Sequence, residues 1–252
     1  QIIDGKSIAA NLRASVKADV EKITALGHRA PGLAVILVGS DHASAVYVNG
    51  KRKACEEVGF KSFSYDLPAS TQQEELENLI DQLNADETVD GILLQLPVPD
   101  HINSTPLLEK IRSDKDVDGF HPENVGYLTV GNPRFIPCTP KGIMRILSHY
   151  DVDLSGKHVV IIGRSNIVGR PVSILTSLKK SFSNATTTIC HSGTKDIRFF
   201  TKQADIIIVA MGVPNFLDKS YIKHGVVLID VGINRVEDDS ERGYTLVGDI
   251  DR

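Results

Sequence analysis

The first part of the chain alternates between helix-like and strand-like patterns of apolar positions. Residues 8–23 carry an apolar side chain at every third or fourth position, which predicts a helix that ends near Gly27. The run LAVILVG (33–39) predicts a short buried strand. A polar loop then leads into a second predicted helix, SAVYVNGKRKACEEVG (44–59). The chain therefore opens with a helix, a strand and a helix.

The same alternation continues in the next segment. SFSYDL (62–67) predicts a second strand, and TQQEELENLIDQLNA (71–85) predicts a helix with Thr71 and Glu74 at capping-box spacing. DGILLQLPVP (90–99) predicts a third strand that ends in prolines, because proline cannot continue a central strand. Alternating strands and helices indicate right-handed βαβ crossovers and a mainly parallel sheet. Ligands are then expected beyond the carboxyl ends of the strands.

The second part of the chain has more strongly apolar strands. A turn-rich segment, VGNPRFIPCTPKG (130–142), precedes it and leads into the helix GIMRILSHY. The strands that follow are nearly continuously apolar, as expected for a sheet covered on both faces: HVVIIG, ATTTIC, ADIIIVAMG and GVVLIDVGIN. We therefore expect an α/β fold of two domains with a cleft between them. Residues 1–138 would form a βαβ substrate domain and residues 139–252 a Rossmann-type nucleotide-binding domain.

Composition limits the class of protein. The 252 residues are 41% hydrophobic and carry a formal net charge of −4, which gives no electrostatic footprint for nucleic acid. No apolar run is long enough to span a bilayer, and the N-terminal segment contains acids, unlike a secretory signal. Cys55, Cys138 and Cys190 are far apart and lack the spacing of a metal site. We expect a cytoplasmic enzyme that binds no nucleic acid, membrane or metal.

The segment GRSNIVGRP (163–171) has the context of a dinucleotide-binding turn. Gly163 ends a predicted strand, and the helix that follows presents N-terminal amides that can cradle a phosphate. Ser165 and Val168 stand where the second and third glycines of a GxGxxG fingerprint would be. The turn alone would also suit an ordinary connection between a strand and a helix. The three strands that follow favour nucleotide binding.

The end of the second strand of the nucleotide-binding domain indicates whether the cofactor is NAD or NADP. NAD-binding folds usually carry an Asp or Glu there, whereas this strand ends in ICHSG without an acid. Arg164 in the phosphate turn can pair with a 2'-phosphate, and Ser192 can add a hydrogen bond, so the sequence favours NADP. A loop arginine is more often only solvated, so Arg164 alone is weak support.

Tyr47 and Lys51 lie one turn apart on a predicted helix, so their side chains reach the same region. A Tyr-x-x-x-Lys pair is also typical of short-chain dehydrogenases, but in those proteins the nucleotide turn opens the chain. Here the pair precedes the turn at Gly163. We therefore expect Tyr47 and Lys51 to face the nicotinamide across the cleft and to act on the substrate. Taken singly, each is more often a packing residue or a surface charge.

Six motifs in a fixed order carry a specific resemblance: YVNGKRKACEEVG, DGILLQLPVP, KDVDGFHPENVG, CTPKGI, GRSNIVGRP and IDVGIN. Across nearly all of residues 1–250, the chain resembles the bifunctional methylenetetrahydrofolate dehydrogenase/cyclohydrolase family. The resemblance implies NADP-dependent oxidation of 5,10-methylenetetrahydrofolate to the methenyl form, and hydrolysis of that form to 10-formyltetrahydrofolate. It also implies a homodimer formed through the nucleotide domain.

The resemblance also implies roles for individual residues. The substrate site would contain Tyr47, Lys51, Leu94, Gln95, Leu96 and Asp118, and the cofactor contacts would be Gly163, Arg164, Ser165, Ser192 and Ile233. We expect a neutral Lys51 to activate water or transfer a proton, because partial burial and a cationic substrate both disfavour the ammonium. Gln95 would hold Lys51 in place, and Tyr47 would stack on or orient the folate. Asp118 would accept two hydrogen bonds from the amino-pyrimidine edge of the pterin.

Several alternatives stay open from the sequence. Asp118 can simply form a turn before Gly119, and Asp116 is an equal candidate on chemistry alone. The chain can also be a two-domain dehydrogenase of the shikimate or amino-acid type, or a non-catalytic module that binds folate or NADP. The family usually continues past GDID with a strand, a proline- and glycine-rich loop and a returning helix. This sequence stops at Arg252 without that segment, so either it is trimmed or the chain is truncated, and truncation would put both activity and stability in question.

Overall fold

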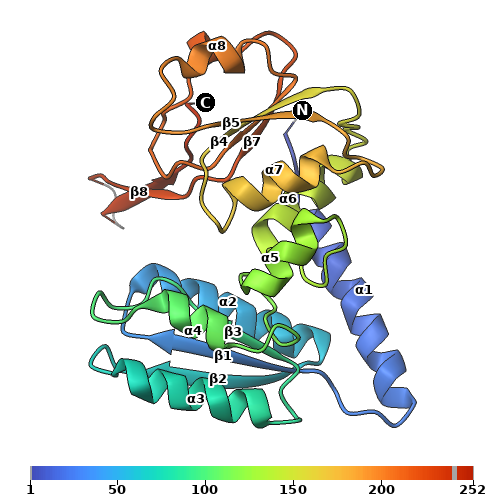
Figure 1. Ribbon diagram of the computed structural model, residues 1–252, viewed down its shortest axis with the longest axis vertical. Coiled ribbons are helices and arrows are strands. Elements are labelled where there is room, and N and C mark those ends of the chain that lie inside the picture. The colour runs from blue at the N-terminus through green and yellow to red at the C-terminus, as the bar shows by residue number, and fades with distance from the viewer. Residues whose placement is uncertain (1, 240–242, 252) are drawn as a thin grey trace. The chain divides into compact units, whose positions relative to one another are not determined.

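The computed structural model describes residues 2–239 and 243–251. The chain forms two compact units, Gln1–Ile136 and Pro137–Arg252, each built around its own parallel sheet (Figure 1). We call them unit 1 and unit 2. This confirms the expected class, an α/β fold of two domains. Within the described residues, no helix combines the length and the apolar character needed to cross a membrane.

Unit 1 is a three-stranded parallel sheet with helices on both faces. Its strands are β1 (Gly32–Val38), β2 (Lys61–Leu67) and β3 (Gly91–Leu94), in the spatial order β2-β1-β3. Its helices are α1 (Gly5–Ala25), α2 (His42–Val58), α3 (Gln73–Ala85), α4 (Ser104–Lys110) and α5 (Pro122–Thr129). Ile36 pairs with Leu94, so the carboxyl ends of β1 and β3 lie side by side.

Alternate side chains of β1 build two cores. Ile36 points to one face and packs in a cluster with Ile80 of α3, and Val35 points to the other face and packs with Val48 of α2. All four side chains are wholly buried. Burial of an aliphatic side chain of this size contributes about 1.5–3 kcal/mol relative to exposure. These contacts fix α2, which carries Tyr47 and Lys51, on one face of the sheet, with α3 on the other (Figure 1).

The third strand is shorter than the sequence predicts. We expected it to run through residue 99, but β3 ends at Leu94. The Gln95 amide still donates to the Ile36 carbonyl oxygen at 2.9 Å, and the chain then leaves the sheet through a cis Leu96–Pro97 peptide bond. Gln95 is therefore the last residue bonded to β1, and its side chain stands at the edge of the sheet.

The capping box of α3 lies one residue later than expected. The Glu75 carboxylate, and not that of Glu74, accepts from the N-cap amide, which belongs to Gln72, at 3.3 Å. Thr71 is instead buried, and its carbonyl oxygen lies 2.9 Å from His101 Nε2. Spacing alone could not separate the two registers. Glu74 lies three residues after Thr71, and Glu75 lies three residues after Gln72, so both pairs have capping-box spacing.

Arg29 and Asp90 join the amino ends of β1 and β3 in unit 1. Arg29 Nη1 and Nη2 lie 2.6 and 2.8 Å from the two carboxylate oxygens of Asp90, which also accepts from the Gly32 amide at 2.7 Å. The hydrogen bond from Arg29, together with that from Gly32, lowers the pKa of Asp90 against the opposing effect of partial burial. A depressed folded-state pKa stabilises the fold above the unfolded-state pKa, and this stabilisation is lost as the pH falls through the folded-state pKa.

Asp90→Asn is therefore expected to lower the free energy of unfolding by about 1 kcal/mol at pH 7, a small value because both side chains are half exposed to solvent. The difference from the parent should shrink below about pH 4, where Asp90 of the unfolded chain becomes protonated. Urea unfolding at about pH 7 and pH 3 measures both values.

The control is Asp19→Asn, which removes an exposed pair with Lys22 and should change stability by less than about 0.5 kcal/mol. An Asp90→Asn effect that did not depend on pH would contradict the linkage.

Unit 2 is a four-stranded parallel sheet. Its strands are β4 (His158–Ile162), β5 (Thr186–Cys190), β6 (Ile206–Val209) and β7 (Val227–Asp230), in the order β5-β4-β6-β7. Its helices are α6 (Cys138–His149), α7 (Gly169–Ser177), α8 (Ile197–Thr201) and the 3-10 helix η1 (Lys219–Tyr221). The chain steps from β4 to one neighbour, β5, and returns to the other, β6. The topological switch point therefore lies between the carboxyl ends of β4 and β6.

A hairpin that the sequence did not reveal follows β7. β8 (Asn234–Glu237) pairs in antiparallel register with β9 (Tyr244–Val247), and the Arg235 guanidinium carbon lies 4.2 Å from the centre of the Tyr244 ring. The strands are only four residues long and carry several polar side chains, so they have neither the apolar run nor the alternation that would predict them.

Candidate active site

Lys51 and Gln95 meet at the carboxyl edge of the unit 1 sheet. Lys51 lies in α2, the helix that follows β1, and Gln95 is the first residue after β3. Lys51 Nζ donates to Gln95 Oε1 at 2.9 Å, and both side chains are partly buried. The sequence separation of 44 residues is bridged because β1 and β3 are adjacent and parallel. The contact expected between these two residues is present.

The Gln95 amide is held at both ends. Its Oε1 accepts from Lys51, and its Nε2 donates to the Leu96 carbonyl oxygen at 2.7 Å. An ammonium or amine hydrogen requires an acceptor and a carbonyl requires a donor, so the two partners fix which end of the amide is oxygen. The Leu94 side chain is 2% exposed and belongs to the core, so any contact of Leu94 with a substrate would come from its backbone.

Tyr47 lies one helical turn before Lys51. Its side chain is 49% exposed, which is unusual for a large aromatic residue on a helix that packs on a sheet. An exposed ring one turn from a partly buried amine can form one wall of a binding surface. The expected stacking or orienting role of Tyr47 stays a prediction.

The structure separates the two candidate aspartates. Asp116 is 3% exposed, and its carboxylate accepts from the His121 amide and from Asn124 Nδ2, both at 2.8 Å. Its carboxylate is therefore used inside the fold, at the start of α5. Asp118 is partly exposed and lies in the turn closed by the Gly119 amide and the Asp116 carbonyl oxygen. Of the two, Asp118 is the one that solvent, and hence a ligand, can reach.

The segment that carries Asp118 is anchored beside β3. Asp116 forms a parallel bridge with Ile92 on the free edge of the strand, so the segment runs toward the same carboxyl edge as Gln95. Lys115 is buried, and its Nζ donates to the carbonyl oxygens of Leu83 and Asp86 at 2.9 and 2.7 Å, at the end of α3. Burial is the main cause that lowers the pKa of Lys115.

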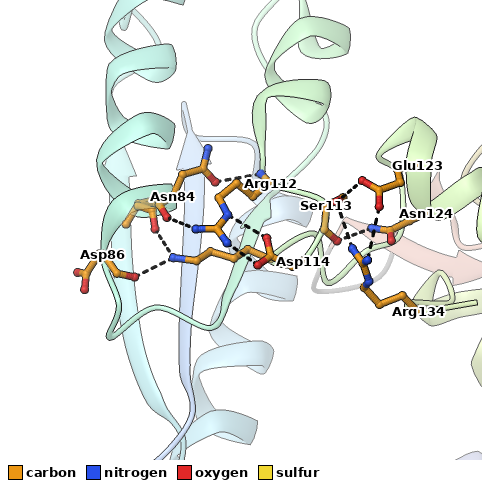
Figure 2. A network of polar contacts seen from close by, with 10 residues as sticks. Asn84, Asp86, Arg112, Ser113, Asp114, Glu123, Asn124 and Arg134 are labelled. Atoms are coloured by element: carbon orange, nitrogen blue, oxygen red, sulfur yellow. Dashed lines mark hydrogen bonds and ion pairs between the residues drawn. The ribbon is translucent and has the colours of Figure 1, made fainter.

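A polar network extends this anchor on both sides (Figure 2). The Arg112 guanidinium pairs with the Asp114 carboxylate. The backbone amide of Arg112 donates to Asn84 Oδ1 at 3.0 Å. Asn124 Nδ2 donates to the Ser113 carbonyl oxygen at 2.8 Å and so ties α5 to the segment. The residues before Asp118 are therefore bound to α3 and to α5, and the position of Asp118 is well defined by its neighbours.

The phosphate turn of unit 2 depends on two glycines. Gly163 directly follows β4 with φ of +128°, and a Cβ at this position would lie 2.3 Å from the Ala210 carbonyl oxygen after β6. A Cβ on Gly169 would lie 2.2 Å from the Gly163 carbonyl oxygen. Gly169 thus allows α7 to approach the strand, which is the role that the third glycine has in the usual fingerprint. Spacing had placed that role at Val168, one residue too early.

The remaining residues predicted to contact the cofactor surround this turn. Ser165 Oγ accepts from the amides of Val168 and Gly169, at 3.1 and 3.4 Å, and so caps the start of α7. Arg164 is exposed in the same turn. Ser192 is exposed after β5, and Ile233 is 63% exposed after β7. All follow carboxyl ends of strands, and their contacts with a cofactor stay predictions.

Sequence reasoning missed Gly169 and Asp249. Asp249 is wholly buried in unit 2, although it lies in an unremarkable GDID segment. An acid between apolar residues after a strand-like run could have signalled a buried carboxylate with backbone partners. Among the residues described, no three His, Cys, Asp or Glu side chains are grouped in a way that could hold a metal ion.

The two units together define a class of protein. Unit 2 has a parallel sheet with a glycine turn at its switch point, as dinucleotide-binding domains do, and unit 1 holds an amine and an amide at the carboxyl edge of a second sheet. These are the features of a nucleotide-dependent enzyme with a separate substrate domain.

Comparison with known families gives the particular class. Residues 3–118 match "Tetrahydrofolate dehydrogenase/cyclohydrolase, catalytic domain", and residues 137–252 match "Tetrahydrofolate dehydrogenase/cyclohydrolase, NAD(P)-binding domain". The chain therefore belongs to the tetrahydrofolate dehydrogenase/cyclohydrolase family. This confirms the resemblance found in the sequence, and with it the enzyme class and the nicotinamide cofactor. It also removes the shikimate-type or amino-acid-type dehydrogenase as an alternative.

Solved structures from distant organisms are similar over nearly the whole chain. The bifunctional enzyme FolD from Campylobacter jejuni is 49% identical, with a TM-score of 0.91, and the match covers 98% of this chain and 85% of that one. The FolD of Trypanosoma brucei, complexed with NADP cofactor and an inhibitor, is 38% identical, with a TM-score of 0.93 and coverage of 99% and 85%. A 5,10-methylenetetrahydrofolate dehydrogenase from the silkworm Bombyx mori is 37% identical, with a TM-score of 0.91 and coverage of 100% and 85%.

Proposed function

We propose that this chain oxidises 5,10-methylenetetrahydrofolate to 5,10-methenyltetrahydrofolate with NADP+, and that it hydrolyses the methenyl form to 10-formyltetrahydrofolate. Both reactions are those of the family to which the chain belongs. The observation that carries the assignment of residues is the 2.9 Å hydrogen bond between Lys51 Nζ and Gln95 Oε1 at the carboxyl edge of the unit 1 sheet.

Lys51 is assigned to proton transfer in the hydrolysis. Water adds to the cationic carbon between two nitrogens, and one carbon–nitrogen bond then breaks. One water proton ends on the nitrogen that leaves, and the other passes to solvent. A neutral Lys51 can take the first proton from the water and return it to the nitrogen.

Gln95 is assigned to orienting Lys51. It accepts one hydrogen of the amine, and its own amide cannot turn without losing the bond from Nε2 to the Leu96 carbonyl oxygen. Tyr47 and Asp118 are assigned to holding the folate. The exposed Tyr47 ring offers an aromatic face to the pterin, and the Asp118 carboxylate can accept two hydrogen bonds from its amino-pyrimidine edge.

The residues of unit 2 fit NADP. Gly163 lets the backbone of the phosphate turn approach Ala210 closely at the switch point. Arg164 and Ser192 are exposed after the neighbouring strands β4 and β5, and no acid stands at the end of β5. An arginine in the phosphate turn, close to a strand end that lacks the acid, suits a 2'-phosphate. The bound cofactor supplies the acceptor for the hydride. The chain contributes the positioning that the transfer requires.

A spectroscopic assay tests the proposal. For the oxidation, the protein is mixed with methylenetetrahydrofolate and NADP+, and the formation of NADPH is followed. Hydrolysis is measured in a separate assay on methenyltetrahydrofolate. Both rates are expected to rise in proportion to protein concentration. Saturable NADP+ binding without either reaction would instead favour a non-catalytic module.

We also propose a homodimer formed through unit 2, in the cytoplasm. β5 is an edge strand of the unit 2 sheet, and Ile189 on it is 37% exposed, so the edge can pair with a second copy. Cys55 and Cys190 are buried thiols that form no disulfide, as suits a reducing compartment. Ile189→Lys is expected to convert a dimer into a monomer in light scattering, because a charge would replace an apolar contact. A variant that stayed dimeric would place the interface elsewhere.

A further inference from the structure

Asp249 is a buried carboxylate on which four hydrogen-bond donors converge. Its side chain is 0% exposed. Oδ2 accepts from the amides of Met211 and Gly212, at 2.7 and 3.0 Å. Oδ1 accepts from the Val213 amide at 2.9 Å and from Asn234 Nδ2 at 2.8 Å. A buried carboxylate has to be satisfied by donors of this kind, and here all of them come from the segments that follow β6 and β7 at one edge of the unit 2 sheet, Asn234 being the first residue of β8.

Three of the donors belong to the loop after β6. Successive backbone N–H groups that point at one anion form a concavity of the type that binds phosphates in other proteins. In residues 211–213 the protein's own carboxylate fills it. Met211 packs against the core of unit 2, whereas Val213 is 42% exposed, so apolar packing fixes only the first residue of this loop. Charge-assisted hydrogen bonds hold the rest of its conformation.

The same carboxylate holds the loop after β7. Asn234 directly follows Ile233, one of the residues assigned to cofactor contact, and its amide donates to Asp249. The backbone also passes very close, because a Cβ on Gly232 would lie 2.2 Å from Asp249 Oδ1. Asp230 at the end of β7 accepts from the Asp249 amide at 3.0 Å, which keeps Asp249 in position.

Both loops border the edge at which a dinucleotide is expected. The 211–213 loop continues from Ala210, whose carbonyl oxygen is the atom that a Cβ on Gly163 would meet at 2.3 Å. It therefore adjoins the phosphate turn at the switch point. The loop after β7 lies at the end of the neighbouring strand, because β6 pairs with β7. Dinucleotides bind along this edge of a parallel sheet.

We propose that Asp249 is a positioning residue for NADP. By accepting from residues 211–213 and from Asn234, it sets the two loops that flank the dinucleotide, without touching the cofactor itself. The inference rests on the proposed NADP-dependent function. It adds to that function a residue that acts through the backbone of the site.

Asp249→Asn tests this role. Asparagine keeps the shape but replaces one acceptor oxygen by an N–H₂ group that faces backbone donors, and buried donors left unpaired are costly. The dissociation constant for NADP+, measured by titration calorimetry, is expected to rise by about 10-fold or more. Hydrogen exchange at the amides of residues 211–213 should become faster. Hydrolysis of methenyltetrahydrofolate, measured without NADP, should change by less than twofold, because its assigned residues lie in unit 1.

Asp205→Asn is the matched control. Asp205 precedes β6 at the opposite edge of the same sheet, where its carboxylate accepts from the His158 amide at 2.9 Å and from Lys223 Nζ at 2.8 Å. This control should lower Tm but leave NADP+ affinity unchanged. A merely structural role for Asp249 would give the same result, namely a lower Tm with NADP+ affinity within twofold of the parent, and would overturn the proposal.

A second variant covers the case in which Asp249→Asn does not fold. Asn234→Ala removes one donor and keeps the carboxylate, and it should raise the KM for NADP+ while kcat for hydrolysis stays unchanged. An unchanged KM for NADP+ in a folded Asn234→Ala would count against the proposal. Failure of the parent protein to bind NADP+ would overturn the proposed function as well, whereas normal binding by Asp249→Asn would overturn the role of Asp249 alone.

Discussion

Replacing Lys51 by methionine is expected to lower the hydrolysis of methenyltetrahydrofolate by about 10²- to 10⁴-fold, the contribution typical of general acid–base catalysis. Methionine preserves the length and apolar stem of lysine but cannot carry a proton. Gln95 Oε1 also loses the donor that it has at 2.9 Å. The hydrolysis rate is followed by the loss of methenyltetrahydrofolate absorbance, at saturating substrate.

Lys53→Met is the matched control for this substitution. Lys53 lies on the same helix, two residues further on, and its side chain is exposed. Its replacement should change the hydrolysis rate by less than twofold. Both variants should bind NADP+ with the affinity of the parent, because the residues assigned to the cofactor lie in unit 2. Undiminished hydrolysis by Lys51→Met would show that Lys51 is not the group that moves the proton.

Gly163→Ala is expected to have the second large effect, on NADP+ binding and on stability together. Alanine at φ of +128° is strained, and its Cβ would meet the Ala210 carbonyl oxygen at 2.3 Å, a backbone atom that a rotamer change cannot move away. We expect the free energy of unfolding to fall by about 2 kcal/mol or more. We also expect the affinity for NADP+ to be lost, since the displaced backbone is the phosphate turn itself.

Gly142→Ala gives the comparison. Gly142 lies within α6, and a Cβ there meets nothing within 4 Å. Alanine favours a helix by about 0.5–1 kcal/mol over glycine, so this variant should be slightly more stable and should bind NADP+ normally. Denaturant unfolding and NADP+ titration of the two variants measure both effects. Equal NADP+ affinity in Gly163→Ala and the parent would mean that the turn does not hold the phosphates.

The sequence predicted the parallel strands and most of the long helices because their signal is local. A continuous apolar run such as that of β1 or β4 has to be covered on both faces, and an apolar stripe such as that of α3 has to lie on a sheet. The short and polar elements carry no such signal, and β8, β9 and α4 were accordingly not predicted.

Exact positions within the elements depended on contacts that are distant in sequence. Spacing placed the third glycine of the phosphate turn at Val168, whereas the approach of α7 to the Gly163 carbonyl oxygen requires it at Gly169. Chemistry alone left Asp116 and Asp118 equal. The contacts of Asp116 with α5 decide that its carboxylate serves the fold.

The sequence by itself determined the fold class, the family, and the residue types available for proton transfer and for phosphate binding, since ordered motifs and apolar periodicity are properties of the chain alone. Only the tertiary structure decided which of these groups meet. Lys51 reaches Gln95 across 44 residues because β1 and β3 pair in parallel, and Asp249 collects donors from two loops because both end at the same edge of a sheet. Such contacts arise from strand pairing over long separations, which no local pattern encodes.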